Sequence, residues 1–262
     1  MIGYIVYKNS DYQRNKWFGN QFVLVFKKYN VELKIILIDN IEELDEYEIP
    51  DFVISRVFDH RVCEYYENKN VRCFNNHLTS FYGNNKKECY KLMDKLQIPY
   101  MPLINGKANL PYIYKSISGH GGKEVFLIDS KEKENELVND NDSTYIKQMI
   151  ASTLGKDMRV YYFDSKIIGA VIRYSNNDYR SNFSLGGRYE FCDVEEYQKK
   201  YIDKIVKYLK PDFIGIDFIS DNGEWVFNEI EDVVGTRILY DSNKFDIIEM
   251  YTKYILKEVQ ND

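Results

Sequence analysis

Short apolar runs alternate with amphipathic stretches over residues 1–80. The runs predict β-strands and the stretches predict helices, an alternation typical of a small, mostly parallel sheet with helices on both faces. The predicted strands are residues 2–7, 32–38, 51–57 and 71–74, and the predicted helices are residues 15–29 and 59–68. Ligands of such sheets bind at the carboxyl ends of the strands, where Arg56 and Asn75 lie. A ligand-binding role and an ordinary surface role are both open for these two residues.

From residue 81 onward the pattern changes to strands joined as hairpins and mixed with helices. A helix predicted over residues 85–96 ends before Pro99, because the residue preceding a proline is disfavoured in the α region. Further helices are predicted after Asp193, which we expect to be an N-cap, and over residues 244–259. The predicted strands in this part are residues 111–117, 123–128, 143–150, 160–163, 166–173, 213–220 and 224–231. The change of pattern places a domain boundary near residue 80.

The last two strands carry acidic residues inside otherwise apolar sequence. They are joined through Asn222-Gly223, the strongest short-range signal for a hairpin. Asp217, Glu229 and Glu231 lie within them, where a carboxylate is costly unless it is paired. Carboxylates that meet at one end of a hairpin suit a hard divalent cation, Mg²⁺ before Zn²⁺.

The register of this hairpin decides whether the three carboxylates meet. A three-residue loop places Asp217 opposite Phe227, so that Glu229 and Glu231 share its face. A two-residue loop places Asp217 opposite Asn228 and separates it from the other two. From these residues alone both registers stay open, and so do a metal site and an ordinary hairpin whose acids face water.

Composition restricts the function classes. The 262 residues include 35 Lys+Arg and 41 Asp+Glu, a net charge of −6, which argues against general binding to nucleic acid or to an anionic membrane. No apolar run approaches the roughly 20 residues that span a bilayer, and the N-terminal residues read as a first strand rather than a signal peptide. The four cysteines show no Cys-x-x-Cys spacing and are expected to be isolated thiols. We expect a cytoplasmic protein.

Two further segments suggest recognition of an anion. The glycine-rich loop Ser118-Gly119-His120-Gly121-Gly122 joins two predicted strands, and its N–H groups could cover phosphates with help from Lys115 and Lys123. A plain turn is the alternative, and His120 is expected to face solvent. Four arginines also cluster in sequence, which suits phosphate or carboxylate recognition unless they are scattered over the surface; they are Arg159, Arg173, Arg180 and Arg188.

The order of these features resembles the ATP-grasp superfamily, and within it the RimK-like and glutathione-synthetase-like carboxylate–amine ligases. The matching motifs are Gly155-Lys156-Asp157-Met158-Arg159-Val160, Tyr179-Arg180-Ser181-Asn182 with Gly186-Gly187, and Gly215-Ile216-Asp217 with Asn228-Glu229-Ile230-Glu231. The resemblance implies an α/β (α+β) ATP-grasp fold with an N-terminal pre-ATP-grasp parallel β/α domain. The implied domains are residues 1–80, followed by an ATP-grasp domain over 81–262 that divides into a nucleotide-clamping part, 81–148, and a metal-binding part, 149–262.

The resemblance also implies a role for individual residues. Lys86 (or Lys87) and Lys115 would neutralise the phosphates of ATP, and the loop residues Gly119, Gly121 and Gly122 would cover them. The segment Lys147-Gln148-Met149-Ile150 would form the adenine hinge, and Asp157 would hold the ribose side. Arg159, Arg180 and Asn182 would act on the transferred phosphate and the acyl group. Asp217, Glu229 and Glu231 would carry one or two Mg²⁺ ions, with Mn²⁺ as an alternative.

The implied activity is an ADP-forming ligation that makes an amide or peptide bond through an acyl phosphate. Its substrates would be a carboxylate and an amine on small molecules or peptides; homo-oligomerisation stays open. Positioning and charge neutralisation would carry this chemistry, without a protein nucleophile. The alternatives are a kinase on the same fold and a nucleotide-binding regulatory module without turnover.

Three departures from the family pattern limit what the resemblance transfers. Gln148 stands where the hinge usually has glutamate, which leaves the nucleotide preference open. Glu231 stands where the last metal ligand is usually asparagine, and its charge favours a second ion. The segment 232–237 lacks the usual small-residue-and-proline turn beside the substrate pocket, so the acceptor is expected to differ from the well-known ones.

Overall fold

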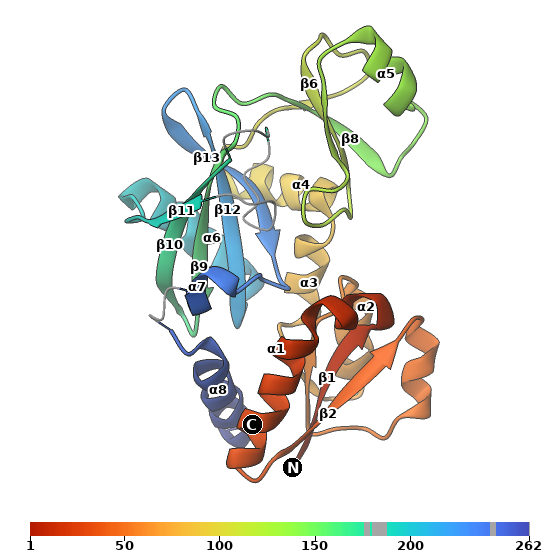
Figure 1. The fold of residues 1–262 in the computed structure, drawn as a ribbon, viewed down its shortest axis with the longest axis vertical. Helices are drawn as coiled ribbons and strands as arrows, with labels where there is room; N and C mark the ends of the chain where they lie inside the picture. Colours follow the sequence, from red (N-terminus) through yellow and green to blue (C-terminus); the bar gives the residue numbers. More distant parts are fainter. Residues whose placement is uncertain (176–178, 180–187, 242–244, 262) are drawn as a thin grey trace.

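The computed structural model describes residues 1–175, 179, 188–241 and 245–261, and the strands in these ranges form three sheets (Figure 1). The sheet nearest the N-terminus is parallel, in the order β2-β1-β3-β4, as the alternating pattern predicted. Its strands are β1 (Ile2–Lys8), β2 (Glu32–Ile38), β3 (Phe52–Ser55) and β4 (Arg72–Phe74), and its helices are α1 (Asn9–Lys28), the 3₁₀ helix η1 (Ile41–Glu46) and α2 (His60–Glu67).

Alternation along these strands gives the parallel sheet two apolar faces. Ile5 and Phe52 lie on the face covered by α1, whereas Val6 and Val53 lie on the face covered by η1 and α2. Helix α1 begins directly after β1, so its first turns lie at the carboxyl edge of the sheet. Arg56 follows β3 at the same edge, the position where ligands of parallel sheets bind.

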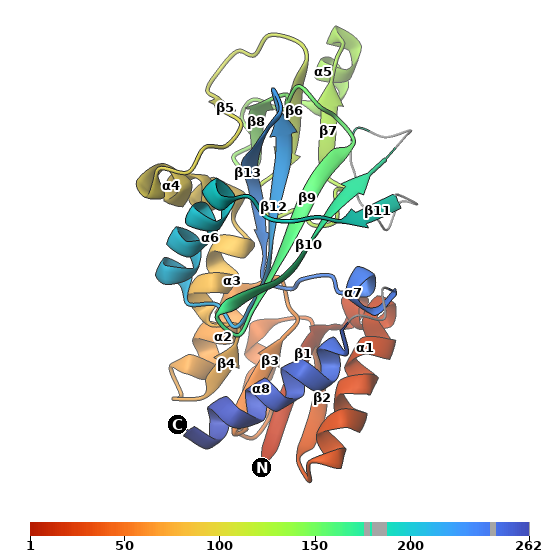
Figure 2. The same ribbon diagram turned by 90° about the vertical axis from the view of Figure 1, so that its left-hand side faces the viewer.

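The C-terminal helix α8 (Ile247–Asn261) packs beside α1, although the two lie at opposite ends of the chain (Figure 2). Its residues Tyr251 and Ile255 share one hydrophobic core with α1 and with Phe163 and Phe213 of the largest sheet. The division of the chain at residue 80 stays a prediction. In space, the last helix joins the parallel sheet to the largest sheet.

The second sheet is small and antiparallel, in the order β5-β8-β6-β7. It follows two helices, α3 (His77–Gly83) and α4 (Lys86–Leu96). Its elements are β5 (Leu103–Ile104), β6 (Tyr112–Ser116), β7 (Val125–Ile128), α5 (Lys131–Leu137) and β8 (Tyr145–Met149). Figure 1 shows this sheet at the opposite end of the molecule from the parallel sheet, with the largest sheet between them. The glycine-rich loop connects β6 to β7.

The largest sheet is antiparallel, in the order β11-β10-β9-β12-β13. Its strands are β9 (Lys156–Phe163), β10 (Lys166–Tyr174), β11 (Arg188–Phe191), β12 (Phe213–Asp221) and β13 (Glu224–Glu231), and the helices after β10 are α6 (Glu196–Leu209), α7 (Arg237–Asp241) and α8. One face packs on α4 and α6 through residues such as Val160 and Ile216. The opposite face carries charged residues and forms the candidate site.

Two local results complete the description. The helix expected after Asp193 begins instead at Glu196, because Glu195 is the N-cap and forms a capping box with Gln198. Among the described residues, no helix is long and apolar enough to cross a membrane.

Candidate active site

The acidic hairpin forms, and its loop is the shorter of the two alternatives that the sequence left open. Asp221 pairs with Glu224, so the turn has two residues, Asn222 and Gly223, with φ of 48° and 88°. Positive φ at both positions matches the right-handed twist of the flanking strands, which is why Asn-Gly favours this turn. The turn alone would separate the acids, as the alternative register predicted.

A β-bulge at Asn228 restores the arrangement. Phe218 pairs with Phe227, and both lie in the core beneath the sheet, whereas Asp217 pairs with Glu229. The extra residue inverts the alternation, so that Glu229 and Glu231 turn to the face of Asp217. One ligand oxygen from each of the three carboxylates lies within 4.8 Å of the others. The carboxylates therefore gather as predicted, for a different structural reason.

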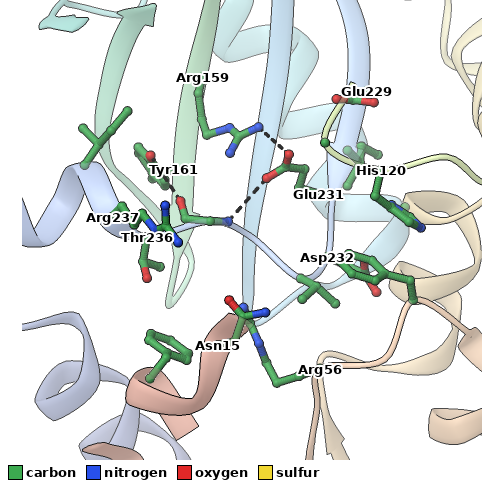
Figure 3. Close-up of a pocket in the computed structure, with 18 of the residues that line it drawn as sticks. Asn15, Arg56, His120, Arg159, Tyr161, Glu229, Glu231, Asp232, Thr236 and Arg237 are labelled. Atoms are coloured by element: carbon green, nitrogen blue, oxygen red, sulfur yellow. Dashed lines mark hydrogen bonds and ion pairs between the residues drawn. The ribbon is translucent and has the colours of Figure 1, made fainter. Parts of the chain in front are cut away.

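Ion pairs run across four strands of this face, β10, β9, β12 and β13. The carboxylate of Asp217 accepts hydrogen bonds from Arg159 Nε (2.7 Å) and Nη2 (2.6 Å), and also from Arg173 Nη2 (2.7 Å). Arg173 also donates two bonds, of 2.7 and 2.6 Å, to Asp157 on the adjacent strand. Arg159 in turn reaches Glu231, at 2.5 Å (Figure 3). The two arginines supply the positive charge that these carboxylates need when buried.

The pKa values of these carboxyl groups reflect two opposing effects, burial and the charges of the arginines. Burial alone would raise the pKa of Asp217, but Arg159 and Arg173 outweigh it and lower the pKa below its ordinary value. For Glu231, burial raises the pKa, Arg159 partly offsets the increase, and the neighbouring Asp217 adds to it. Crowded carboxylates in which one member resists ionisation are a suitable environment for a further cation.

Lys86 connects the glycine-rich loop to this cluster. The lysine is the first residue of α4 and is buried, with 6% of its surface exposed. Its Nζ donates to the carbonyl oxygen of Gly119 at 2.6 Å and lies 3.6 Å from Glu229 Oε2. One ammonium therefore lies between the loop and a carboxylate.

Lys115, on β6, is also buried, and its Nζ donates to the hydroxyl of Tyr90 at 2.7 Å. The side-chain oxygen of Asn228 lies 3.5 Å from the same atom. Burial, and then the charge of Lys86, lower the pKa of Lys115 to about 7. The lysine thus lacks a carboxylate partner within ion-pair distance among the described residues, and an approaching anion would restore its charge.

The glycine-rich loop adopts backbone conformations that favour glycine: φ is 65° at Gly121 and 73° at Gly122. The expectation that His120 faces solvent is wrong. Its ring stacks on Phe58, with centroids 3.8 Å apart, and burial lowers its pKa to about 4. Phe58 follows β3, so this stack joins the loop to the N-terminal part of the chain.

The predicted hinge residues lie at the end of β8 with their side chains on different sides. Gln148 is buried and donates from Nε2 to the carbonyl oxygen of Met101 at 2.7 Å, and the N–H of Met149 donates to the carbonyl oxygen of Pro102 at 2.9 Å. Lys147 points away, because its Nζ binds Asp140 and the carbonyl oxygen of Gly106. Gln148 and Met149 line a cavity, whereas Lys147 and Ile150 are not among its lining residues.

Two cavities meet at this site. The first, of about 130 Å³, lies between the small sheet and the large one and is lined by Lys115, Gln148, Gly122 and Asp157. The second, of about 430 Å³, lies between the acidic cluster and the N-terminal part of the chain. Four residues line both cavities and mark their junction: Lys86, Gly119, Gly121 and Glu229. Two ligands in these cavities would meet beside an ammonium group and a carboxylate.

Three aspects of the predicted site differ from the sequence expectation or lie beyond it. Arg180 and Asn182 lie outside the described residues. Asp157 lines the first cavity, but its carboxylate is held by Arg173. Tyr90, which holds Lys115, was missed, and Arg173 was noted only as part of an arginine cluster. The sequence placed Asp157 and Arg173 on the two strands of one hairpin, but their pairing depends on a bulge that it did not show.

Comparison with known proteins places this geometry in a family. The RimK-like ATP-grasp domain family matches residues 88–255. The chain is 27% identical to the uncharacterized protein MG011 of Mycoplasma genitalium over 244 residues, 90% of this chain and 85% of that protein. It is 31% identical to human N-acetylaspartylglutamate synthase A over 156 residues, which are 58% of this chain and only 40% of that enzyme.

Solved structures agree on the fold. The chain superimposes on D-alanine–D-alanine ligase from Bacillus anthracis, complexed with ATP, with a TM-score of 0.76 and 16% identity, covering 100% of this chain and 98% of that one. The predicted ATP-grasp fold is thereby confirmed. The chain belongs to the RimK-like ATP-grasp family, and as a member of it the protein is an ATP-dependent carbon–nitrogen ligase.

Proposed function

We propose that the protein joins a carboxylate to an amine through an acyl phosphate, with ATP in the smaller cavity and the carboxylic acid in the larger one. The observation that carries this proposal is the junction of the two cavities, where Lys86, Gly119, Gly121 and Glu229 line both. A γ-phosphate reaching this junction from one side would meet a carboxylate from the other. Such positioning of two reactants is a large part of catalysis by this chemistry.

The phosphates of ATP have suitable partners in the smaller cavity. Lys115 and Lys86 supply ammonium groups, and the loop with positive φ at Gly121 and Gly122 brings N–H groups over them. Since Lys115 has no carboxylate partner within ion-pair distance among the described residues, an incoming phosphate would be its counterion. The buried position makes that interaction stronger than it would be in water.

The adenine is expected beside Gln148 and Met149. The amide nitrogen of Gln148 already donates to Met101, so its carbonyl oxygen is the atom left to accept from the adenine amine. The N–H of Met149 donates to the carbonyl oxygen of Pro102. Recognition of the adenine ring nitrogens is therefore left to main-chain groups that follow Met149 in the chain. The ribose is expected near Asp157, whose main contribution is to hold Arg173.

The family uses ATP and a divalent metal ion, and the donor set here fits a hard cation such as Mg²⁺. Glu229 and Glu231 are its natural ligands, since each has oxygen lone pairs left by its contacts with Lys86 and Arg159. Asp217 would contribute through a lone pair not used by its arginines. A bound ion would neutralise charge on the transferred phosphate.

The chemistry follows from these positions. A carboxylate oxygen of the acid attacks the γ-phosphorus, the bond to the bridging oxygen breaks, and ADP leaves. The amine then attacks the acyl carbon and loses a proton, and phosphate leaves with one oxygen of the original carboxylate. Arg159 would hold developing negative charge, because Asp217 and Glu231 fix its guanidinium at the cavity wall. Arg180 and Asn182 are proposed to assist.

The relatives suggest a range of substrates without naming one. N-acetylaspartylglutamate synthase A and β-citrylglutamate synthase B are named for products that join an acid to glutamate. Only about two fifths of each is covered by this chain, 40% and 37% respectively. We therefore propose an acid and an amine of small-molecule or peptide size.

Hydroxylamine trapping tests the proposed function. The purified protein is incubated with Mg²⁺, ATP, hydroxylamine and single candidate acids, and hydroxamate and ADP are quantified together. We expect hydroxamate in step with ADP for an accepted acid. Phosphate transfer to a hydroxyl substrate without hydroxamate would instead identify a kinase.

A further inference from the structure

Helix α4 directs two polar side chains toward the space between the two antiparallel sheets. Lys86 and Tyr90 are four residues apart, so they lie on the same face of the helix. Lys86 joins the glycine-rich loop to Glu229, whereas the proposed chemistry assigns no step to Tyr90, which is buried with 1% of its surface exposed. A hydroxyl buried this completely needs hydrogen-bond partners, so its partners define its role.

The hydroxyl of Tyr90 is bonded to groups from both antiparallel sheets. It accepts a hydrogen bond of 2.7 Å from Lys115 Nζ on β6 and donates one of 2.8 Å to the main-chain oxygen of Asn228 on β13. Burial raises the pKa of Tyr90 well above its ordinary value, and a hydrogen bond from the Gln148 amide on β8 acts in the opposite direction. Because a phenol donates one hydrogen and can accept two, these three groups use its full capacity.

The group that accepts from Tyr90 belongs to the residue on which the metal site depends. Asn228 is the bulged residue of β13, and its extra place in the strand turns the acids that follow it onto the face of Asp217. The side-chain oxygen of Asn228 also lies 3.5 Å from Lys115 Nζ. Tyr90 therefore holds the ammonium of Lys115 against the same bulge that orients the carboxylates.

The ring of Tyr90 is held independently of its hydroxyl. It stacks on the ring of Tyr100, with centroids 4.6 Å apart, and meets the ring of Phe227 edge-on. The N–H of Phe227 in turn donates to the carbonyl oxygen of Pro99 at 2.9 Å, which keeps Tyr100 beside β13. Deleting the hydroxyl oxygen alone should leave this packing in place, so that only the hydrogen bonds of the hydroxyl change.

We propose that Tyr90 is a positioning residue for phosphate transfer, whose hydroxyl sets the ammonium of Lys115 at a fixed place relative to the metal-binding carboxylates. The lysine would contact the phosphates of ATP, whereas Tyr90 would act only through the lysine and through the bulge at Asn228. This inference rests on the proposed function for the transfer step, but the link from Tyr90 to nucleotide binding requires neither acid nor amine.

The pH profile of nucleotide binding tests the link to Lys115. Calorimetry measures the affinity of the wild-type protein and of Tyr90→Phe for AMP-PNP, a non-hydrolysable analogue of ATP, in the presence of Mg²⁺. The other charged or titratable groups that act on the pKa of Lys115 are Lys86 and Cys89 on α4 and Glu229 on β13, and the variant retains all of them.

The expected change has a definite sign. The hydroxyl accepts from the charged ammonium, so its removal disfavours the charge and lowers the pKa of Lys115. The pH above which the affinity for AMP-PNP falls should therefore decrease by about one unit. Tyr90→Phe should bind about ten-fold more weakly than the wild type at about pH 8 and nearly as tightly at about pH 5.5.

Tyr100→Phe is the matched control, because its ring stacks on Tyr90 but its hydroxyl donates to Asp94 at the surface. It should leave the pH profile unchanged. In a Lys115→Met background, Tyr90→Phe should change the affinity for AMP-PNP by less than about two-fold, because Tyr90 acts through the lysine. A thermal scan of each variant verifies that it is folded.

Turnover tests the positioning itself. With an acid accepted in the hydroxylamine screen, Tyr90→Phe should lower kcat by about 10- to 100-fold, while KM for ATP at about pH 5.5 stays within about two-fold. An affinity lowered equally at every pH, an unshifted profile, or a wild-type kcat would overturn the inference. A shifted profile without hydroxamate from any acid would leave the link between Tyr90 and Lys115 standing and refute the ligase chemistry.

Discussion

Replacing Arg173 by leucine should destabilise the protein more than almost any other single charge removal in the described chain. Only 6% of its side chain is exposed, and it holds two carboxylates, Asp157 (8% exposed) and Asp217 (1% exposed). Removing it leaves Asp157 without this bidentate partner and Asp217 with Arg159 alone. Breaking a buried pair by deleting one partner costs about 3–5 kcal/mol, because an uncompensated charge stays behind. For a chain of this size that corresponds to a Tm lower by about 6–20 °C.

Urea unfolding followed by circular dichroism, together with a thermal scan, measures this change. The control is Arg61→Leu, which removes an arginine whose side chain is 62% exposed and whose partner is Asp59. That loss should stay within about 1 kcal/mol, since exposed pairs contribute little. Adding Asp157→Asn to the Arg173 variant should recover part of the stability by removing the stranded charge. If the Arg173 and Arg61 variants were equally stable, the buried ion-pair account of this sheet would be refuted.

Three further predictions concern the nucleotide and metal site. The pKa of Lys115 is lowered to about 7, and phosphate binds the protonated form of the lysine. The affinity for Mg·ATP should therefore be constant below pH 7 and fall by up to about ten-fold per pH unit above it. Calorimetry should show that binding at pH 8 takes up a proton, and Lys115→Met should abolish both the pH dependence and the proton uptake. Glu229→Gln should lower turnover, measured as ADP release, by about 100-fold or more, while circular dichroism shows that the variant is folded. The control Glu224→Gln, at the exposed end of the hairpin, should leave turnover unchanged. Wild-type turnover in Glu229→Gln would contradict the metal assignment. Phe58→Ala removes the ring that stacks on His120. It should weaken Mg·ATP binding several-fold with little change in the Tm of the ligand-free protein, and a thermal-shift titration with Mg·ATP measures both quantities. Unchanged affinity would show that the stack does not support the glycine-rich loop.

The sequence predicted the elements well because hydrophobic alternation and turn residues are local signals. Residues 32–38 match β2, and the Asn-Gly turn forms where expected. It could not predict register, because a bulge is decided by packing across the sheet. In the acidic hairpin, a core that buries both Phe218 and Phe227 forces an extra residue at Asn228 before the acids can turn outward.

A second bulge has the same effect on the neighbouring hairpin. The turn at Asp164-Ser165 would pair Asp157 with Ile172, but an irregularity between Ile167 and Gly169 shifts the register by one. Asp157 consequently pairs with Arg173 and their ion pair forms. The carboxylate assigned to the ribose side by resemblance is therefore engaged by an arginine, which motif order alone could not reveal.

The surroundings of Arg56 show the opposite limit. The position of Arg56 at the carboxyl end of a strand was visible in the sequence, but its environment was not. Phe18, over whose ring the guanidinium of Arg56 lies, and Tyr240, which lines the same cavity, are far from Arg56 along the chain. Surroundings assembled from three distant segments depend on tertiary packing, which local sequence patterns do not show.

The measurement that tests the central claim most directly follows oxygen from substrate to phosphate. An acid accepted in the hydroxylamine screen is labelled with ¹⁸O in its carboxylates and incubated with ATP, Mg²⁺ and the amine that completes the reaction. Mass spectrometry of the released phosphate should show one ¹⁸O atom per phosphate, because the acyl phosphate leaves with one oxygen of the carboxylate. Phosphate without the label, released at the same rate as ADP, would contradict the acyl phosphate and with it the proposed function.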